Sequence, residues 1–442
     1  MDKNILSVLN EMGAEKVARQ LLYAAGQFDS FSFLESASAS NPITNSFSSS
    51  YDFICGISSK QEICSLNNPF ADIQEFTAKN KGQWIFGHLN YDIKNSVEPS
   101  LSSNQPDSIG FPAFRLFVPE TVVICQNGNI RTWGNKALLQ EILTASEPIS
   151  FLEESAEKHS VTAVSFKEYK RNFEKIRFHL QRGDIYEINY CIPFIARNIS
   201  LNMPTIRIKQ KIKSPAPFSA LYKSGHHWLS CASPERFIRK TGNKIMSQPI
   251  KGTTRRTGMI ADDAIAKNQL QNSEKERAEN IMIVDLVRND LSRIAQKGSV
   301  QVDQLFGIYE FAQVYQMIST VSATLREDIT FTDILKALFP PGSMTGAPKI
   351  SAMKIIEETE SFKRGLFSGM VGYINPFGDF DFNVVIRSIL YNEETKTALI
   401  PAGGALTIKS NVLDEYNECL LKAQANLDLL SLTLPTTEKA RN

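Results

Sequence analysis

The sequence predicts an α+β protein, and three observations point to that class. Residues 1–155 carry strand-like apolar runs, such as Thr121 to Cys125, and little long helical periodicity. From about Ser165 the pattern changes, and amphipathic helices alternate with strand-like segments to the C-terminal end. Of the 442 residues, 42% are apolar and 10% aromatic, which is enough to bury a large core without disulfide bonds.

Charge and cysteine usage exclude several classes of protein. Lys and Arg number 48 and Asp and Glu number 47, so no field of one sign is available to hold nucleic acid or an anionic membrane. The six cysteines contain no CxxC pair, and the N-terminus lacks a basic patch followed by an apolar run; both features predict a cytoplasmic protein. No apolar stretch approaches the roughly 20 residues of a membrane-spanning helix.

Three segments have the periodicity of amphipathic helices. Residues 167–181 repeat apolar side chains at spacings of three and four. Residues 273–288 begin with a capping box formed by Ser273 and Glu276. A third helix is expected over residues 413–427.

Carboxylates lie on the faces of the second and third helices. Glu279 is in line with the apolar Ile283, and Glu415, Glu418 and Lys422 follow one another at i, i+3 and i+7. Two helices therefore direct acid groups along faces that should be partly buried. Such acids are ordinarily salt-bridged, whereas two carboxylates that converge on an oxygen-rich ligand also suit Mg²⁺. Spacing alone leaves both interpretations open.

Lys251 and Glu235 lie in short polar segments between apolar runs. A solvated lysine in a glycine turn is the ordinary interpretation of Lys251, because most lysines are exposed. A nucleophilic lysine would have to be neutral, which burial promotes, and the following Gly252 would let a ligand approach closely. Glu235 is ordinarily a turn carboxylate.

The glycine-rich segment 340–349 lacks the GxxxxGK(S/T) spacing of a phosphate-binding loop, so we do not expect it to bind a nucleotide.

Residues 165–427 resemble the chorismate-utilising enzyme family, which includes anthranilate, aminodeoxychorismate, isochorismate and salicylate synthases. The motifs that carry the resemblance are Gly183-Asp184-Ile185-Tyr186-Glu187-Ile188-Asn189, Ser233-Pro234-Glu235, Pro249-Ile250-Lys251-Gly252-Thr253, residues 279–291 (ENIMIVDLVRNDL), residues 342–349, Val385-Ile386-Arg387, Ala402-Gly403-Gly404 and residues 415–422. The resemblance implies two stacked, largely antiparallel β-sheets flanked by helices, with the active site between them. It divides the chain into a β-rich subdomain (1–155), a chorismate-binding catalytic domain (156–430) and a polar tail (431–442).

The resemblance also implies a role for individual residues. Glu235 would be the general acid that protonates the departing C4 hydroxyl of chorismate, which requires a raised pKa. Mg²⁺ would be held by Glu279 and Glu418, with Glu415 close by, and would bind the C1 carboxylate of chorismate. The residues implied in substrate binding are Gly252, Thr253, Thr345, Phe367, Arg387, Ala402, Gly403, Gly404 and Lys422.

Lys251 distinguishes between branches of the family. Anthranilate and isochorismate synthases usually have alanine here, whereas aminodeoxychorismate synthases resemble this chain. The implied activity is conversion of chorismate and ammonia into 4-amino-4-deoxychorismate, a precursor of p-aminobenzoate and folate. The lysine amine would attack C2 as the C4 hydroxyl leaves, and ammonia would resolve the adduct at C4. Ammonia would come from a separate glutamine amidotransferase subunit.

Three other positions differ between the branches. Glu187 stands where isochorismate synthases place a lysine thought to activate water. Gln316 stands where the family often has a histidine linked to pyruvate elimination, and an amide cannot act as a base at neutral pH. Phe367 replaces a tyrosine of anthranilate synthases and so removes one substrate hydrogen bond.

Residues 33–36 (Phe-Leu-Glu-Ser) resemble the stretch that binds tryptophan in anthranilate synthases. Two interpretations stay open: a tryptophan pocket in which Ser36 is joined by Pro217, Phe218 and Ser219, or a buried Ser-Glu pair that braces the sheet, which we favour.

Two rival functions of the whole chain are also retained. One is anthranilate synthase component I, and the other is a non-catalytic regulatory subunit that binds chorismate or tryptophan.

Overall fold

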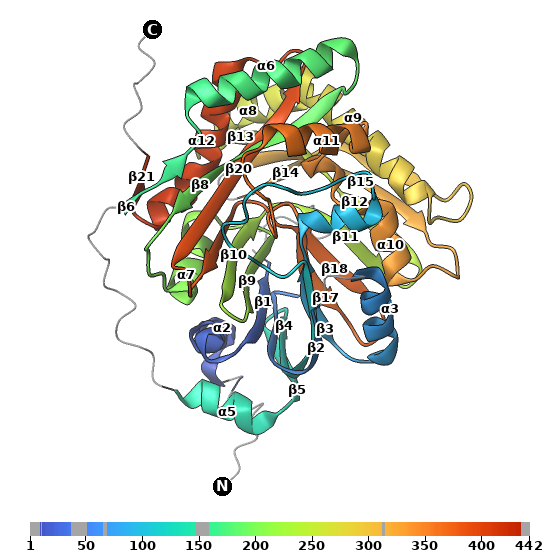
Figure 1. The fold of residues 1–442 in the computed structure, drawn as a ribbon. Helices are drawn as coiled ribbons and strands as arrows, with labels where there is room; N and C mark the ends of the chain where they lie inside the picture. Colours follow the sequence, from blue (N-terminus) through green and yellow to red (C-terminus); the bar gives the residue numbers. More distant parts are fainter. Residues whose placement is uncertain are drawn as a thin grey trace.

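One continuous antiparallel sheet contains most of the strands of the computed structural model (Figure 1), which describes residues 9, 11–36, 51–64, 69–145, 159–311 and 314–434. Its first half runs through the neighbouring strands β8 (Glu187–Ala196), β20 (Thr397–Thr407), β19 (Ser388–Asn392), β10 (His227–Ser233), β9 (Phe218–Ser224) and β1 (Ser30–Glu35). β2 (Phe53–Ile63) and β4 (Phe114–Gln126) connect this half to the second.

The second half of the sheet carries one side of the site described below. It runs through β3 (Ile85–Leu89), β17 (Met370–Ile374), β18 (Phe380–Val384), β11 (Arg236–Thr241), β12 (Lys244–Gln248) and β15 (Val314–Thr324), which also pairs with β13 (Ile250–Arg255) and β14 (Gln301–Glu310). Shorter strands are β5 (Asn129–Gly134), β6 (His159–Ser160), β7 (Thr162–Ala163), β16 (Gly346–Ala347) and β21 (Leu432–Thr433).

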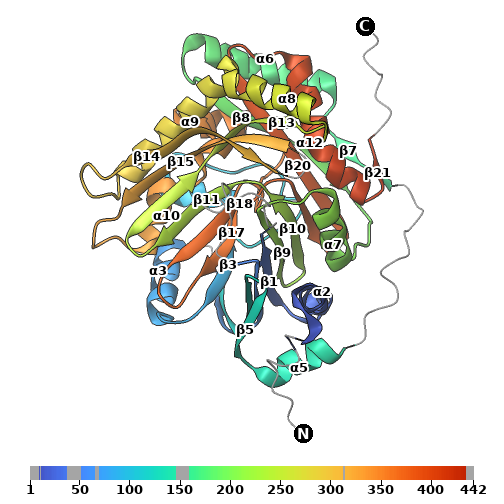
Figure 2. The same cartoon turned by 180° about the vertical axis from the view of Figure 1, so that it is seen from behind.

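Helices lie on the outside of the sheet (Figures 1 and 2). α7 (Met203–Lys213), α9 (Glu274–Ser292) and α12 (Val412–Leu429) supply residues to the site described below, and the same half of the molecule carries α6 (Phe166–Arg182), α8 (Ile260–Asn272) and α11 (Lys349–Thr359). The others are α2 (Ala14–Ala24), α3 (Pro69–Lys79), α4 (Lys94–Val97), α5 (Lys136–Thr144) and α10 (Phe331–Leu338). α12 packs on β20 and α11 on β8, whereas α9 packs on β13 and β15. Among the described residues, every helix is too short or too polar to cross a membrane.

The three predicted helices, α6, α9 and α12, begin within one residue of their predicted starts, for local reasons. Ser165 caps α6 by accepting a hydrogen bond from the Glu168 N–H, and Gly183 ends that helix at a left-handed φ of 78°. Ser273 caps α9, which continues past its predicted end at Arg288 to Ser292. The buried face of α9 includes Glu279, so packing of this helix brings a carboxylate into the interior.

The α+β class and the antiparallel layers are confirmed, and the structure adds that the two layers are halves of one continuous sheet. β1 pairs with β9 and β3 pairs with β17, so the N-terminal strands are built into the same sheet as the strands that carry the proposed site. The predicted domain boundary near residue 155 lies outside the described residues.

Candidate active site

A cavity of about 1390 Å³ lies between the β13–β15–α9 layer and the β20–α12 layer. These elements meet in the same upper part of the molecule in Figure 1. The cavity brings together residues predicted to act in catalysis, metal binding and substrate binding: Glu235, Lys251, Gly252, Thr253, Glu279, Phe367, Arg387, Ala402, Gly403, Glu415, Glu418 and Lys422. It is large enough for an organic acid together with a second reactant.

Lys251 is buried in the cavity wall and forms an ion pair with Glu187. Its Nζ lies 2.5 Å from Glu187 Oε1, and Glu187 is only 1% exposed. Burial lowers the pKa of Lys251, but the negative charges of Glu187 and Glu279 outweigh burial, so its pKa is raised overall. The resting lysine is therefore an ammonium ion. Nucleophilic attack by this side chain requires that a proton first be removed.

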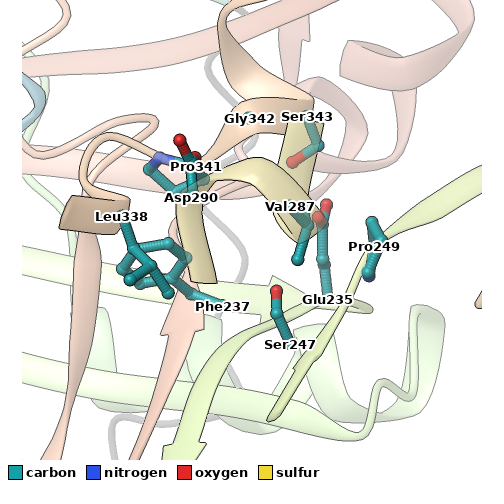
Figure 3. A pocket seen from close by; sticks show the side chains of 10 residues that line it. All are labelled: Glu235, Phe237, Ser247, Pro249, Val287, Asp290, Leu338, Pro341, Gly342 and Ser343. Carbon is teal, nitrogen blue, oxygen red and sulfur yellow. The ribbon is translucent and has the colours of Figure 1, made fainter. Parts of the chain in front are cut away.

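Glu235 lies between the large cavity and a smaller cavity behind it. Figure 3 shows its side chain rising between Val287 and Pro249, with the carboxyl group toward Ser343. Glu235 is 5% exposed, and burial raises its pKa to about 7. A large fraction of the group is thus protonated at neutral pH, as a general acid requires.

Glu279 and Glu415 share a lysine. Lys275 Nζ lies 3.9 Å from Glu279 Oε1 and 3.7 Å from Glu415 Oε1. Burial raises the pKa of Glu279 to about 7, and its Oε1 accepts no hydrogen bond. Burial also raises the pKa of Glu415, which accepts a hydrogen bond from Ser410. Lys275 is thus a positive charge shared by the two buried carboxylates, Glu279 and Glu415.

Mg²⁺ fits the chemistry of these side chains. Carboxylate oxygens are its preferred protein ligands, and Glu279 Oε1 accepts no hydrogen bond and has only the 3.9 Å ion pair with Lys275. Within the described ranges, no three His, Cys, Asp or Glu side chains converge closely enough to hold a metal ion. Binding of Mg²⁺ would therefore have to displace Lys275 and draw the carboxylates together.

Glu418, the other predicted metal ligand, is held by Lys422. Burial alone would raise the pKa of Glu418, but the ammonium of Lys422, 2.5 Å away, brings its pKa below the ordinary value. Lys422 also donates to the backbone carbonyl of Gly403 at 2.8 Å and so ties α12 to β20. At Gly403 an added Cβ would lie 2.4 Å from Cys191 Sγ, so only glycine fits there.

Three predicted substrate-binding residues have distinct surroundings. Arg387 lines the cavity and has a left-handed φ of 52°, which is uncommon for a non-glycine residue and typical of functional sites. Thr345 is fully buried and donates to the Gly342 carbonyl at 3.0 Å, so it does not line the cavity. Gly404 lies behind the wall, where a Cβ would meet Glu415 at 3.3 Å. The roles of these residues remain predictions.

The residues of the predicted tryptophan pocket do not line the cavity. Ser219 donates to the Ala216 carbonyl, and the Ser36 N–H donates to the Asp52 carbonyl. Phe218 packs with Tyr309 and Ile318, and Pro217 precedes it. The neighbouring Glu35 accepts hydrogen bonds from Arg207 and Lys211. Tryptophan binding remains a prediction, and the ion pairs of Glu35 support the bracing interpretation.

Sequence reasoning missed the contacts of Glu187 and Lys275. The Glu187 and Lys251 positions are 64 residues apart, so no local pattern reveals the pair. Lys275 and Glu279 are spaced i, i+4 on α9, which is a readable signal. Gln316 also lines the cavity, and its buried Oε1 has no hydrogen-bond partner.

Comparison with known proteins assigns the family. A family model described as chorismate binding enzyme matches residues 29–428. The chain belongs to the chorismate binding enzyme family. It is similar to "Probable aminodeoxychorismate synthase, chloroplastic" of Oryza sativa subsp. japonica, with 37% identity over 66% of this chain and 32% of the rice protein. It is also similar to "Aminodeoxychorismate synthase component 1" of Bacillus subtilis, with 33% identity over 84% of this chain and 71% of that protein.

A solved structure shares the fold. The crystal structure of anthranilate synthase component I from Streptococcus pneumoniae has a TM-score of 0.75 and 25% identity, and the match covers 89% of this chain and 94% of that one. The chain spans about a third of the rice protein's length. The activity of the whole rice protein is therefore not assigned to this chain on similarity alone.

Proposed function

We propose that this chain converts chorismate and ammonia into 4-amino-4-deoxychorismate, as the aminating component of an aminodeoxychorismate synthase. The observation that carries the proposal is a buried lysine, Lys251, in the wall of the same cavity as the carboxylic acid Glu235. A nucleophile and a proton donor are the two groups needed to replace a ring hydroxyl.

The chemistry follows from those two groups. Lys251 attacks C2 of chorismate, both conjugated ring double bonds shift, and the C4 hydroxyl leaves as water with the proton of Glu235. Ammonia then attacks C4, both double bonds shift back, and the C2–N bond to Lys251 breaks. The new ammonium at C4 returns a proton to Glu235, so one ammonia enters and one water leaves.

Other side chains of the cavity would hold the substrate. Arg387 and Lys422 offer positive charge to the carboxylates of chorismate, and Arg387 can bind one in a bidentate manner. Mg²⁺, held by Glu279 and Glu418 with Glu415 nearby, would add positive charge for a substrate carboxylate. Ammonia would come from a glutamine amidotransferase subunit, which the words "component 1" in the name of the Bacillus subtilis relative support.

The rival function is anthranilate synthesis, which the structural likeness to the Streptococcus pneumoniae protein favours. That reaction ends with loss of pyruvate and formation of an aromatic ring. Gln316 lines the cavity where a histidine would serve this elimination, and its amide has no basic nitrogen. Lys251 and Gln316 together favour amination at C4 with the enolpyruvyl group retained.

Product analysis tests the proposal. The purified chain is incubated with chorismate, Mg²⁺ and ammonium, with and without added aminodeoxychorismate lyase, and the products are separated by chromatography. We expect p-aminobenzoate only when the lyase is present. Formation of fluorescent anthranilate without the lyase would establish the rival function instead.

A further inference from the structure

We propose that Glu187 is the base that takes the proton from Lys251 before this amine attacks the substrate, and that returns the proton when the amine is released. The inference rests on the function proposed above and adds a catalytic group to it.

The geometry of the pair supports this role. Lys251 Nζ and Glu187 Oε1 are 2.5 Å apart, within the range for direct proton transfer. Glu187 begins β8, where it is fixed by pairing with Ala347 of β16 and Thr407 of β20. The carboxylate therefore stays beside the amine while the substrate changes.

Incomplete hydrogen bonding makes Glu187 suited to accept a proton. Its Oε2 is buried and has no hydrogen-bond partner, so the anion is poorly compensated. Transfer of the proton from Lys251 converts two buried charges into two neutral groups. Both groups are buried, so the neutral pair lies closer in free energy to the resting ion pair than it would in water, and the transfer leaves the amine with a free electron pair.

Other charged groups act on Lys251 through space. They come from α9 and from the turn between β10 and β11, and they are Glu235, Glu276 and Glu279. Lys275 of α9 acts in turn on Glu276 and Glu279. Glu235 must keep its own proton for the leaving hydroxyl, and Glu279 is a candidate metal ligand. Glu187 is left as the carboxylate that is both hydrogen-bonded to Nζ and free of another task.

The proton balance closes over the cycle. The proton of the ammonium passes from Lys251 to Glu187, and the neutral amine forms its bond to C2 as described above. When ammonia has attacked C4, the C2–N bond breaks and Lys251 leaves as a neutral amine. Glu187 then gives the proton back, and the ion pair is restored.

The experiment measures kcat between about pH 6 and pH 10 for the wild type and for Glu187→Gln, at a constant concentration of unprotonated ammonia. The amide keeps the shape but cannot hold the proton. At about pH 7 we expect kcat to fall roughly 10²- to 10³-fold, with KM for chorismate little changed. The ratio of variant to wild-type kcat should rise with pH, because hydroxide then deprotonates Lys251; the ratio cancels the Glu235 ionisation that both share.

Two further variants keep the test decisive. Glu187→Asp retains a carboxylate at a greater distance and should show a lower kcat with a ratio that does not depend on pH. Glu357→Gln removes the partner of another buried lysine, Lys94, at 2.7 Å and outside the cavity. The ratio of kcat for Glu357→Gln to kcat for the wild type should be independent of pH. A ratio that rises with pH only for Glu187→Gln would distinguish a base from a structural ion pair.

Three results would overturn the inference. Glu187→Gln could equal or exceed the wild type at about pH 7, which would mean that Glu187 only holds the lysine in its charged form. It could lose the same factor at every pH, or Glu187→Asp could keep the full kcat. If the wild type releases anthranilate, the proposed function fails and the inference with it, a result that product analysis distinguishes from the other three.

Discussion

Two buried carboxylates of this protein are paired with cations in different ways. Glu35 uses both of its oxygens, accepting from Arg207 at 3.0 Å and from Lys211 at 2.5 Å. Glu187 uses one oxygen, which accepts from Lys251, and leaves Oε2 without a partner. A fully bonded carboxylate stabilises the fold around it, whereas a partly bonded carboxylate next to a reactive amine has an acceptor oxygen that no other group occupies.

The largest effect is expected at the amine itself. Lys251→Ala removes the nucleophile, so amination of chorismate should slow by on the order of 10⁴-fold or more. Chorismate binding, measured by calorimetry, should change little because the carboxylate-binding groups remain. Turnover within a few fold of wild type would rule out a covalent role for Lys251. It would also remove the catalytic role proposed for Glu187.

The acid on the other side of the substrate should show the next largest effect. Burial raises the pKa of Glu235 to about 7, and the protonated form is the active one, so kcat should fall as the pH rises above about 7. Glu235→Gln should lower kcat by about 10²- to 10³-fold and abolish that decline. A pH profile of kcat at a constant concentration of unprotonated ammonia checks both points. If kcat of the variant still falls above about pH 7, the ionisation of another group causes the fall.

Removing the charge of Glu35, the structural carboxylate, should lower stability without lowering kcat. Glu35→Gln leaves the buried Arg207 without its anion, which should lower the free energy of unfolding by about 3–5 kcal/mol. Denaturant titration measures the loss, and kcat should stay near the wild-type value at a temperature where the variant is folded. A specific fall in kcat with normal stability would contradict the division between the two carboxylates.

Removing the lysine from the carboxylate cluster should have a smaller effect, on metal affinity. Lys275 is about half exposed and lies within 4 Å of Glu279 and Glu415, so it competes with Mg²⁺ for the same charges. Lys275→Gln should raise Mg²⁺ affinity about twofold to fivefold, as expected for a partly exposed ion pair. Calorimetric titration without substrate is the measurement, and weaker binding in the variant would show that Lys275 supports the metal site.

The smallest effect concerns tryptophan. Because the oxygens of Glu35 are already bonded, we expect added tryptophan to leave Tm unchanged, since a ligand raises Tm only if it binds the folded state. A rise in Tm that grows with tryptophan concentration would favour the tryptophan pocket at Ser36 instead.

Local pattern predicted the elements that carry the site. Caps and apolar spacing predicted α6, α9 and α12, and their faces brought Glu279, Glu415 and Glu418 to one cavity. The charge state of Lys251 could not be predicted in this way. It depends on Glu187, which reaches the amine from another layer of the sheet; the sequence argument required a lysine that becomes neutral, and the structure shows a resting ammonium with a proton acceptor beside it.

Mass spectrometry of the quenched reaction would test the covalent role of Lys251 most directly. The chain is mixed with chorismate and Mg²⁺ in the absence of ammonia, quenched and digested. We predict an added mass equal to chorismate less one water, located on the peptide that contains Lys251, and its loss when ammonium is supplied. Amination that proceeds with no adduct on that peptide would contradict the account.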